Sequence, residues 1–309
     1  MTIVPQRLSS RWRPDYPGAE AVRQSMMRHI HKEPEKLPPG VLEQDLEAHI
    51  LARLKINRER VIPWLDSIRP LTGSRILEIG CGTGASTLAL AEQGAKITAI
   101  DVDLPSIRVA YDRCSAYGVE AEFLVANGGE LDRLFFPHPF DWIIVYATLE
   151  HMTYEERIGC LKTAWQMLSP GSFLCIIDTP NRLWYFDDHT SLLPFFHWLP
   201  DDLAFDYSRF STRANFKELY REHTPEWKAH FLSRGRGVSF HEFELAITPR
   251  QELRVAGCMS LYHRELDPAE NSQWANSPGA LYGQLLQHFC PDVHQAFLQP
   301  YLDFVLVRA

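Results

Sequence analysis

The sequence lacks any long apolar run. No stretch of its 309 residues approaches the roughly 18 uninterrupted apolar residues that a membrane-spanning helix needs. The N-terminal stretch MTIVPQRLSSRWRPDYPG also contains no apolar segment of the kind found in secretory signals. We therefore expect a soluble cytoplasmic protein with no membrane span.

Clustered cysteines and basic runs are missing as well. The chain has no CxxC pair and no run of Lys or Arg, and its formal net charge is −8. A disulfide framework, a thiolate zinc site and a nucleic-acid partner are all disfavoured by these features. The six scattered cysteines are Cys81, Cys114, Cys160, Cys175, Cys258 and Cys290. Nothing in the sequence indicates an oligomeric state.

Short apolar runs alternate with helix-like stretches from residue 75 onward. Runs this apolar indicate strands covered on both faces, and hence a largely parallel sheet between helical layers. The expected strands are residues 75–80, 96–101, 120–126, 140–147, 172–178, 238–247 and 301–308. The sequence therefore predicts an α/β fold with a doubly wound, seven-stranded sheet.

Local signals place the ends of two helices in this alternation. Asp103 is a predicted N-cap, Pro105 falls in the first turn and Gly118 is the expected stop. Thr153 and Glu156 have the spacing of a capping box for the helix that runs toward residue 167.

We divide the chain into four segments. An N-terminal helical segment (1–70) precedes the core (71–179), and the last two strands fall in 237–309. Between them, an aromatic-rich insertion (180–236) follows the fifth strand, and its residues 180–231 include 13 Phe, Trp or Tyr. Such residues usually serve packing, but an insertion at this point emerges at the ligand-binding edge of the sheet. We predict a substrate cap, with Asp188, Trp184, Phe195 and Trp198 as candidate acceptor contacts.

The stretch ILEIGCGTGAS, residues 76–86, has the form of a nucleotide-binding corner. Glycines let a ligand approach the backbone where a strand enters a helix. Gly80, Gly82 and Ala85 satisfy the dinucleotide pattern GxGxxG/A, so a nicotinamide-dependent oxidoreductase is a competing interpretation. A P-loop is excluded because no GK[ST] follows.

Neighbouring residues bear on which ligand this turn holds. Glu78 would repel a pyrophosphate but could accept hydrogen bonds from an ammonium group. Asp101 ends the second expected strand 21 residues after Gly80, where it could bind ribose hydroxyls in either interpretation. Asn127, just past the third expected strand, could meet an adenine edge.

Five segments occur together in one order: E78-x-G80-x-G82-x-G84, AIDVD around Asp101, Asn127, FDWIIVYATLEH and LSPGSFLCI. In this combination the chain resembles the class I S-adenosylmethionine-dependent methyltransferases over roughly residues 75–178. The resemblance implies a Rossmann-like methyltransferase sheet and S-adenosyl-L-methionine as cofactor. The cofactor-binding residues taken from it are Glu78, Gly80, Cys81, Gly82, Gly84, Asp101, Val102, Asn127, Gly128 and Tyr146.

The resemblance also assigns a part of the cofactor to these positions. Glu78 and the glycine turn would hold the methionine part, Asp101 the ribose, and Val102 would pack on adenine. Asn127 with Gly128 would read the adenine amino edge, although the family often has Asp at position 127. Cys81 is interpreted as a small packing residue and not as a nucleophile.

LEH followed by DTPNRLW is similar to small-molecule O-methyltransferases of the ubiquinone-biosynthesis type. His151, His189 and Glu150 are the catalytic candidates, because methyl transfer to a hydroxyl needs a base near neutral pKa. Some relatives bind a divalent metal through ExxEH, but Ala147 replaces the first Glu here. We predict no metal ligand; a metal on Glu150 and His151 would need Asp187, Asp188 or His189 as well.

We therefore expect a methyltransferase that acts on a hydroxyl or carboxylate of a fairly apolar small molecule, as in quinone or secondary metabolism. Two alternatives remain: the nicotinamide-dependent oxidoreductase, and a methyltransferase-like protein that binds the cofactor without catalysis. Titrations with the two cofactors would distinguish the oxidoreductase from the methyltransferase. The second would be indicated by loss of the acid and base residues, and these are present.

Overall fold

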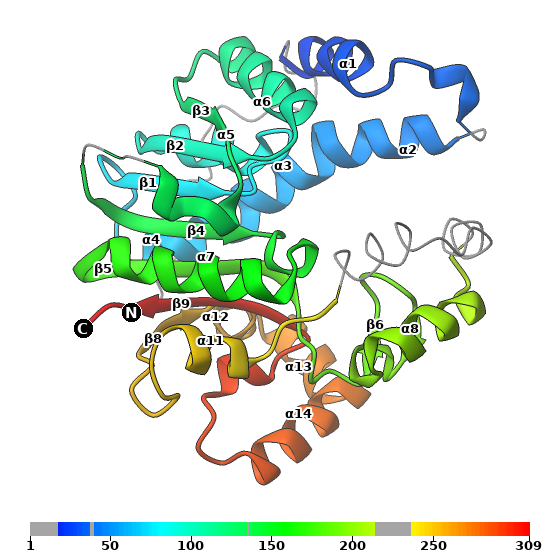
Figure 1. The fold of residues 1–309 in the computed structure, drawn as a ribbon, viewed down its shortest axis with the longest axis vertical. Coiled ribbons are helices and arrows are strands. Elements are labelled where there is room, and N and C mark those ends of the chain that lie inside the picture. The colour runs from blue at the N-terminus through cyan, green and yellow to red at the C-terminus, as the bar shows by residue number, and fades with distance from the viewer. Residues whose placement is uncertain (1–17, 38–39, 135, 137, 214–235) are drawn as a thin grey trace. The chain divides into compact units, whose positions relative to one another are not determined.

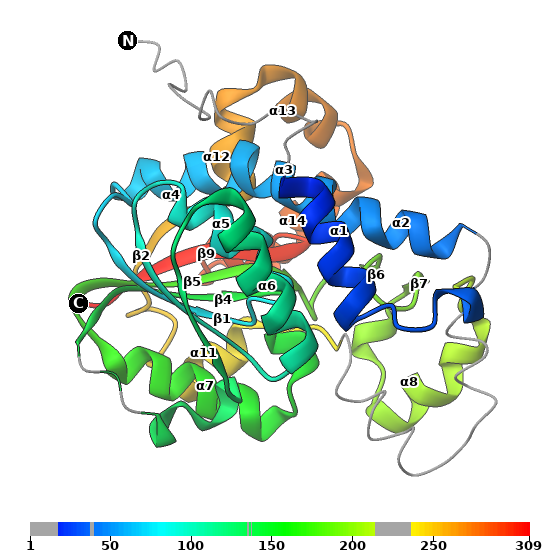
Figure 2. The same cartoon turned by 90° about the horizontal axis from the view of Figure 1, so that it is seen from above.

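The computed structural model describes residues 18–37, 40–134, 136, 138–213 and 236–309 (Figures 1 and 2). Seven of the described strands form one mixed sheet in the order β3-β2-β1-β4-β5-β9-β8. They are β1 Arg75–Ile79, β2 Lys96–Asp101, β3 Glu122–Val125, β4 Phe140–Tyr146, β5 Leu168–Pro180, β8 Val255–Cys258 and β9 Tyr301–Val307. The prediction of a seven-stranded α/β sheet is confirmed. Parts of the predicted N-terminal segment (1–17) and insertion (214–235) lie outside the described residues.

The chain divides into two compact units. The first comprises Met1–Gly128 and Phe136–Ile144, and the second comprises Gly129–Phe135 and Val145–Ala309. No helix among the described residues is long and apolar enough to cross a membrane.

The first unit contains the parallel strands that follow one another through helices. β1 pairs with β2, and β2 with β3, all in parallel register. The intervening helices are α5 (Ala85–Ala91) and α6 (Leu104–Tyr117). Asp103 caps α6 by accepting from the N–H of Ser106, and the left-handed Gly118 ends the helix, as the sequence predicts. Strands β1 and β2 are mostly buried because both of their faces carry apolar side chains, whereas β3 is partly exposed.

A helical segment precedes the sheet in the same unit. It consists of α1 (Gly18–His29), the short turn η1 (Pro34–Lys36), and then an unbroken run from residue 41 to residue 68. The run comprises α2 Val41–Glu47, η2 Ala48–Ala52, α3 Arg53–Ile56, η3 Asn57–Val61 and α4 Ile62–Ile68, of which η2 and η3 are π-helical turns. A buried apolar cluster joins the N-terminal helices to α6 through Val109. The predicted helical N-terminus is confirmed where it is described.

The second unit holds the antiparallel side of the sheet. β5 pairs with β9 and β9 with β8, both antiparallel, and the β5 register shifts between Ile176 and Thr179. Helix α7 (Tyr154–Met167) packs against β5. Its N-terminus has the predicted capping box, in which Thr153 and Glu156 each bond the other's backbone N–H.

The expected strand at residues 238–247 is wrong, because the structure has helix α11 (Phe240–Ala246) there. Ser239 and Glu242 form a capping box, the helix-start signal that an interpretation based on apolar content overlooks. Phe240 and Phe243, three residues apart, are both buried on the helix, and this spacing fits a helical period and not strand alternation. The sheet's missing strand is instead β8.

The remaining described elements belong to the second unit, except that η4 begins at Gly128, the last residue of the first unit's first range. They are η4 Gly128–Arg133, η5 Leu149–His151, β6 Phe186–Asp187, β7 Leu193–Pro194, η6 Phe196–Trp198, α8 Asp201–Tyr207, η7 Ser208–Phe210, α12 Met259–Leu266, α13 Pro268–Ala275, α14 Pro278–Phe289 and η8 Gln295–Leu298. β6 and β7 form a small separate sheet.

Candidate functional site

The glycine turn connects β1 to α5 and requires its glycines. Gly80, Gly82 and Gly84 have φ values of 82°, 49° and 78°, the left-handed region that other residues rarely adopt. A Cβ on Gly84 would lie 2.7 Å from Cβ of Ala110 in α6, so the turn and α6 are in close contact. The space that a Gly82 side chain would occupy is open. The turn therefore exposes backbone at Gly82, as a ligand-binding turn would.

Glu78 is fully buried, and both of its carboxylate oxygens are engaged by α5. Ser86 Oγ donates to Oε1, and Thr87 Oγ1 donates to Oε2 at 2.5 Å. Burial raises the pKa of Glu78 to about 6. The carboxylate thus ties β1 to α5. The contact of Glu78 with an ammonium group stays a prediction. In such a contact, the carboxylate oxygens would accept hydrogen bonds from the ammonium group as well as from the two hydroxyls.

Asp101 fixes backbone on both sides of the predicted cofactor region. Its Oδ2 accepts from the N–H of Gly82 at 2.8 Å, and its Oδ1 accepts from the N–H of Asp103 at 2.9 Å. Val102 follows with 66% of its side chain exposed, as a surface that packs on a ligand would be. Asn127 is half-buried and Gly128 is buried, just after β3.

Cys81 and Tyr146 complete the predicted cofactor set. Cys81 is buried, and burial raises the pKa of its thiol well above the usual range, so the thiolate needed for nucleophilic chemistry is disfavoured. Tyr146 is half-buried and ends β4 in the second unit.

The ends of β4 and β5 carry two residues in a left-handed conformation that neither side chain favours. Ala147 has φ 45° and Asp178 has φ 55°. The N–H of Ala147 donates to the carbonyl of Ile177 at 2.9 Å, so the ends of β4 and β5 lie side by side. The N–H of Asp178 donates to Oδ1 of the buried Asp303 at 2.6 Å, which holds it in place. Strained backbone of this kind is often found at functional sites.

A buried carboxyl and two imidazoles meet close to these strand ends. Oε1 of Glu150 lies 3.8 Å from Nε2 of His151 and 4.0 Å from Nε2 of His189. Glu150 is fully buried, and burial raises its pKa to about 8. Its Oε1 accepts no hydrogen bond from the described residues, while its Oε2 is 3.5 Å from the hydroxyl of Thr179. The structure thus brings together all three catalytic candidates.

The two histidines differ in their surroundings. His151 ends η5 and its side chain is 49% exposed, whereas that of His189 is 27% exposed. Burial lowers the pKa of His189, so its neutral form, the form that accepts a proton, is favoured. Nδ1 of His189 is 2.8 Å from Oγ1 of Thr190, and its Nε2 is the atom nearest Glu150.

Asp187 holds the turn that carries His189. Its carboxylate accepts from the N–H groups of His189, Thr190 and Ser191 at 2.7 to 3.1 Å and from the Ser191 hydroxyl at 2.7 Å. Nε2 of the buried His197 lies 3.3 Å from Oδ1 of Asp187. Burial opposes the shift, but the adjacent His197 imidazole and the hydrogen bond from Ser191 lower the pKa of Asp187 to about 2. Asp187 therefore orients the backbone of the turn and not the imidazole ring itself.

Asp188 has a different partner. The hydroxyl of Tyr301 donates to its Oδ1 at 2.8 Å. Burial raises the pKa of Tyr301, and the nearby carboxylates and this hydrogen bond add to the shift. Neither Asp187 nor Asp188 joins the group of Glu150, His151 and His189.

The three aromatic residues among the four candidate acceptor contacts are not equivalent. Trp184 is 7% exposed and stacks on Trp274 of α13, with ring centroids 6.2 Å apart. Phe195 and Trp198 are 46% and 52% exposed, and their rings meet edge to face at 5.0 Å. Trp184 is thus part of an apolar core, while the other two lie at a surface.

One group of described residues has the spacing of metal ligands. One ligand atom each from Glu150, His151 and His189 lies within 4.8 Å of the others. A carboxylate oxygen without a hydrogen-bond donor and two imidazole nitrogens fit a divalent transition metal, so these residues could hold one. The predicted absence of a metal ligand stays a prediction.

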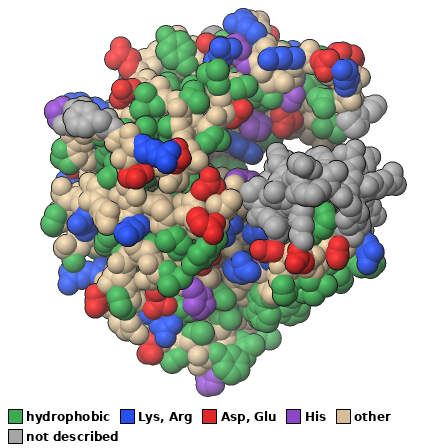
Figure 3. All heavy atoms as spheres, viewed as in Figure 1, with side chains coloured by type: hydrophobic (Ala, Val, Ile, Leu, Met, Phe, Trp, Pro, Cys, Tyr) green, Lys and Arg blue, Asp and Glu red, His purple; other side chains and the backbone are tan. Residues whose placement is uncertain are grey.

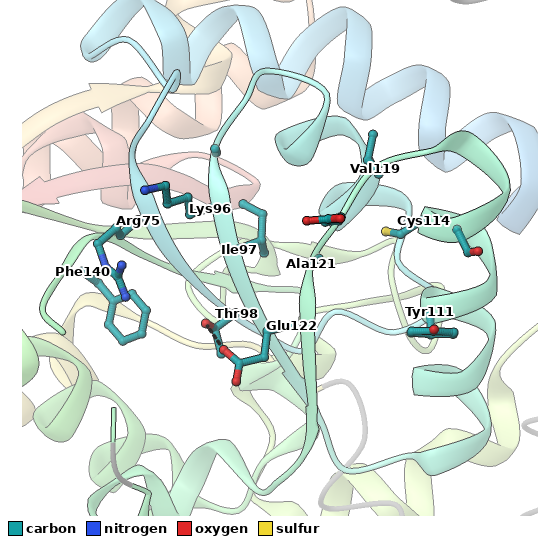
Figure 4. Close-up of a pocket in the computed structure, with 13 residues that line it drawn as sticks. Arg75, Lys96, Ile97, Thr98, Tyr111, Cys114, Val119, Ala121, Glu122 and Phe140 are labelled. Carbon is teal, nitrogen blue, oxygen red and sulfur yellow. Dashed lines mark hydrogen bonds between the residues drawn. The ribbon is translucent and has the colours of Figure 1, made fainter. Parts of the chain in front are cut away.

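A cavity of about 700 Å³ lies at the other ends of the first unit's strands (Figure 4). Arg75, Lys96 and Glu122, the first residues of β1, β2 and β3, line it together with Tyr111 of α6. Ligands of open α/β sheets bind at the carboxyl ends of strands. This cavity is therefore separate from the glycine turn.

Sequence reasoning missed the residues that act over long separations in the chain. Asp303 supports Asp178 from 125 residues away, and His197 in η6 lies 3.3 Å from Asp187 in β6. An acidic residue inside the apolar strand β9 was the available signal for Asp303.

On the face of the molecule in Figure 3, acidic and basic side chains are interspersed.

Residues 76–171 match the family model of a methyltransferase domain. The chain is similar to a cypemycin N-terminal methyltransferase of Streptomyces sp (34% identity over 113 residues, 36% of this chain and 44% of that protein). It is also similar to a ubiquinone biosynthesis O-methyltransferase of Xylella fastidiosa (35% identity over 113 residues, 37% of this chain and 44% of that protein). The chain spans about half the length of the curated relatives it matches.

Solved structures show partial similarity. PKMT2 from Rickettsia typhi in complex with AdoHcy aligns with a TM-score of 0.47 and 18% identity, over 77% of this chain and 49% of that one. Magnesium protoporphyrin IX methyltransferase from Synechocystis PCC 6803 with bound SAM aligns with a TM-score of 0.38 and 18% identity, over 56% of this chain and 81% of that one.

Proposed function

We propose that the protein is an S-adenosylmethionine-dependent methyltransferase that acts on a hydroxyl or carboxylate of a fairly apolar small molecule, because residues 76–171 match the family model of a methyltransferase domain and the chain is similar to a ubiquinone biosynthesis O-methyltransferase. The methyl group comes from S-adenosylmethionine. The bond from sulfur to the methyl carbon breaks as a bond from the acceptor oxygen forms, and S-adenosylhomocysteine leaves.

The group of Glu150, His151 and His189 carries this proposal. A hydroxyl acceptor must lose its proton during transfer, and a neutral imidazole is a suitable base. We assign that role to Nε2 of His189 or His151. The imidazolium that forms would lie within about 4 Å of Glu150, and an adjacent positive charge favours ionisation of a carboxyl whose pKa is about 8. Glu150 thus stabilises the protonated base.

The proposed cofactor residues are those of the glycine turn with Asp101, Val102, Asn127 and Gly128. In support, Gly82 exposes its backbone and Val102 exposes an apolar side chain. The proposed acceptor contacts are the aromatic Phe195 and Trp198 and the polar Asp188 in the cap. Aromatic side chains exposed beside a few polar groups are typical of small-molecule sites.

A divalent metal on the same three residues is a second candidate, supported by their spacing and by Oε1 of Glu150, which accepts no hydrogen bond from any described residue. The metal would supply Lewis-acid activation of the acceptor oxygen when bound. In that case Glu150, His151 and His189 would act as ligands and not as acid and base.

The proposal is tested by incubating the protein with S-adenosylmethionine and phenols, catechols, carboxylic acids and amines. We expect S-adenosylhomocysteine release with a hydroxyl or carboxyl acceptor and a product heavier by one methylene. Methylation of amines alone would contradict the assignment of the methylated atom. Fluorescence titrations with S-adenosylhomocysteine and NAD form the control, and binding of NAD alone would reject the cofactor.

A further inference from the structure

The helical segment before the sheet reaches the glycine turn through His49. This residue lies in the π-helical turn η2, and its Nδ1 is 3.1 Å from Oγ1 of Thr83, between Gly82 and Gly84. The imidazole side chain is 19% exposed, and burial lowers its pKa to about 4. His49 is therefore neutral near pH 7 and meets Thr83 as a hydrogen-bond partner, not as a charge.

A buried arginine of α6 joins the same two residues through their backbones. Nε of Arg113 donates to the carbonyl of Thr83 at 2.7 Å, and Nη2 donates to the carbonyl of His49 at 2.9 Å. Arg113 is fully buried, and burial lowers its pKa to about 10, so the guanidinium remains charged at neutral pH. A charged donor forms strong hydrogen bonds to carbonyls. The contact between His49 and Thr83 is thus fixed at the side chain and at the backbone.

The second π-helical turn, η3, fixes the other end of α5. Arg58 in η3 donates from Nε and Nη2 to the two carboxylate oxygens of Glu92, the residue that follows α5, at 2.8 and 2.5 Å. Isolated π-helical turns occur often at functional sites, because the extra residue redirects the side chains around it. Here one such turn contacts the residues before α5 and the other contacts the residue after it.

We propose that His49 is a positioning residue of the cofactor site, which holds Thr83 and the backbone of the glycine turn in the conformation that binds the amino-acid part of S-adenosylmethionine. The proposal rests on the proposed function, since it takes the glycine turn as the cofactor site. It assigns part of the N-terminal segment to the cofactor site, a role that the sequence alone does not indicate. Cofactor binding and the docking of residues 48–61 then stabilise each other, because linkage is reciprocal.

The first test compares S-adenosylhomocysteine affinities by calorimetry. We expect His49→Ala to weaken binding about threefold to tenfold, the effect of losing one net hydrogen bond. His49→Asn should restore most of the affinity, because its amide nitrogen takes the place of Nδ1. The matched control is His31→Asn, since His31 bonds Asp45, the carboxylate 3.7 Å from Nε2 of His49, and the variant leaves the contact between His49 and Thr83 in place. Its affinity should stay within about twofold of the wild-type value.

The second test asks whether His49 acts through Thr83. The Thr83→Val variant and the double variant Thr83→Val with His49→Ala should bind S-adenosylhomocysteine equally weakly, because either substitution alone already removes the contact between the two residues. Additive losses would overturn the proposal, as would equal affinity of wild type and His49→Ala.

The third test uses the wild-type protein alone, so its result does not depend on whether a variant folds. S-adenosylhomocysteine should slow amide hydrogen exchange in residues 48–61 as well as in the glycine turn. Protection of the turn without residues 48–61 would reject the role of the N-terminal segment. Absence of any binding by the wild-type protein would instead reject the proposed function.

Discussion

Oε1 of Glu150, completely buried, lies 4.0 Å from Nε2 of His189, a residue 39 positions further along the chain. The carboxyl follows β4, and the imidazole is in the turn that Asp187 holds. Burial shifts the two pKa values in opposite directions: it raises that of Glu150 to about 8 and lowers that of His189 below its usual value. Both shifts favour the uncharged forms at neutral pH, a protonated Glu150 beside an imidazole that can accept a proton.

The first prediction concerns the base. His189→Ala should lower turnover about 10²- to 10⁴-fold, the usual contribution of general-base catalysis, while S-adenosylhomocysteine affinity stays nearly unchanged. His151→Ala is measured in parallel, because either imidazole could be the base. Initial rates with a responsive acceptor, alongside calorimetry, decide between them. Normal turnover in both variants would show that alignment of the substrates alone carries the reaction.

The second prediction uses the raised pKa of Glu150. Its carboxyl titrates near pH 4.5 when unfolded and near pH 8 when folded. Between these values the folded state holds a proton that the unfolded state lacks, so the free energy of unfolding falls as pH rises. Glu150→Gln should thus be more stable than wild type at pH 8, by up to a few kcal/mol, and the gain should shrink toward pH 5.

Urea unfolding of both proteins at several pH values measures this difference. Glu78 also has a raised pKa, but it is present in both proteins and its contribution cancels. A stability gain that does not change with pH would show that Glu150 does not titrate in this window.

The third prediction separates acid–base chemistry from metal binding. If the three residues work as acid and base, turnover should survive dialysis against a chelator. Loss of activity that added Mn²⁺ or Mg²⁺ restores would assign Glu150, His151 and His189 as ligands instead. Metal analysis of the purified protein before and after dialysis is the control.

The fourth prediction concerns Asp101. Asp101→Ala should cost about 1.5 to 3 kcal/mol of cofactor affinity, the range for hydrogen bonds to a charged group. Asp103→Ala is the matched control, because it removes a helix cap two residues away and should cost about 1 kcal/mol of stability with little change in affinity. Calorimetry with S-adenosylhomocysteine measures the affinities. Equal affinity of Asp101→Ala and wild type would contradict the proposed ribose contact.

Local signals in the sequence were enough for much of the fold. The cap at Asp103, the stop at Gly118 and the capping box at Thr153 all act within a few residues, and each is confirmed. The strand expected at 238–247 failed because apolar content outweighed the capping box of Ser239 and Glu242. A local interpretation succeeds where short-range chemistry decides the structure.

The candidate site shows where such reasoning ends. The resemblance and the residue types identified Glu150, His151 and His189 as candidates, but their approach depends on a turn fixed by Asp187. Asp178 depends on Asp303, which is 125 residues away. Without the fold, no spacing in the sequence reveals that these residues meet. The same holds for His49 and Thr83, which are 34 residues apart.

The last prediction concerns the aromatic residues of the insertion. Trp184 is buried against Trp274 and Tyr282, so Trp184→Ala should lower the free energy of unfolding by about 3 to 5 kcal/mol through the cavity it leaves. Phe195 and Trp198 are about half exposed. Their replacement by Ala should cost less stability and should instead raise the KM for the acceptor, with cofactor affinity unchanged.

Thermal melts and acceptor kinetics on the same preparations separate the two effects. The substrate-cap proposal expects Phe195→Ala or Trp198→Ala to melt near the wild-type temperature and still use the acceptor poorly. Trp184→Ala serves as the comparison, because its loss of activity should follow its loss of folded protein. If Phe195→Ala and Trp198→Ala lose activity only in proportion to early melting, the exposed aromatic pair serves packing and acceptor recognition lies elsewhere in the chain.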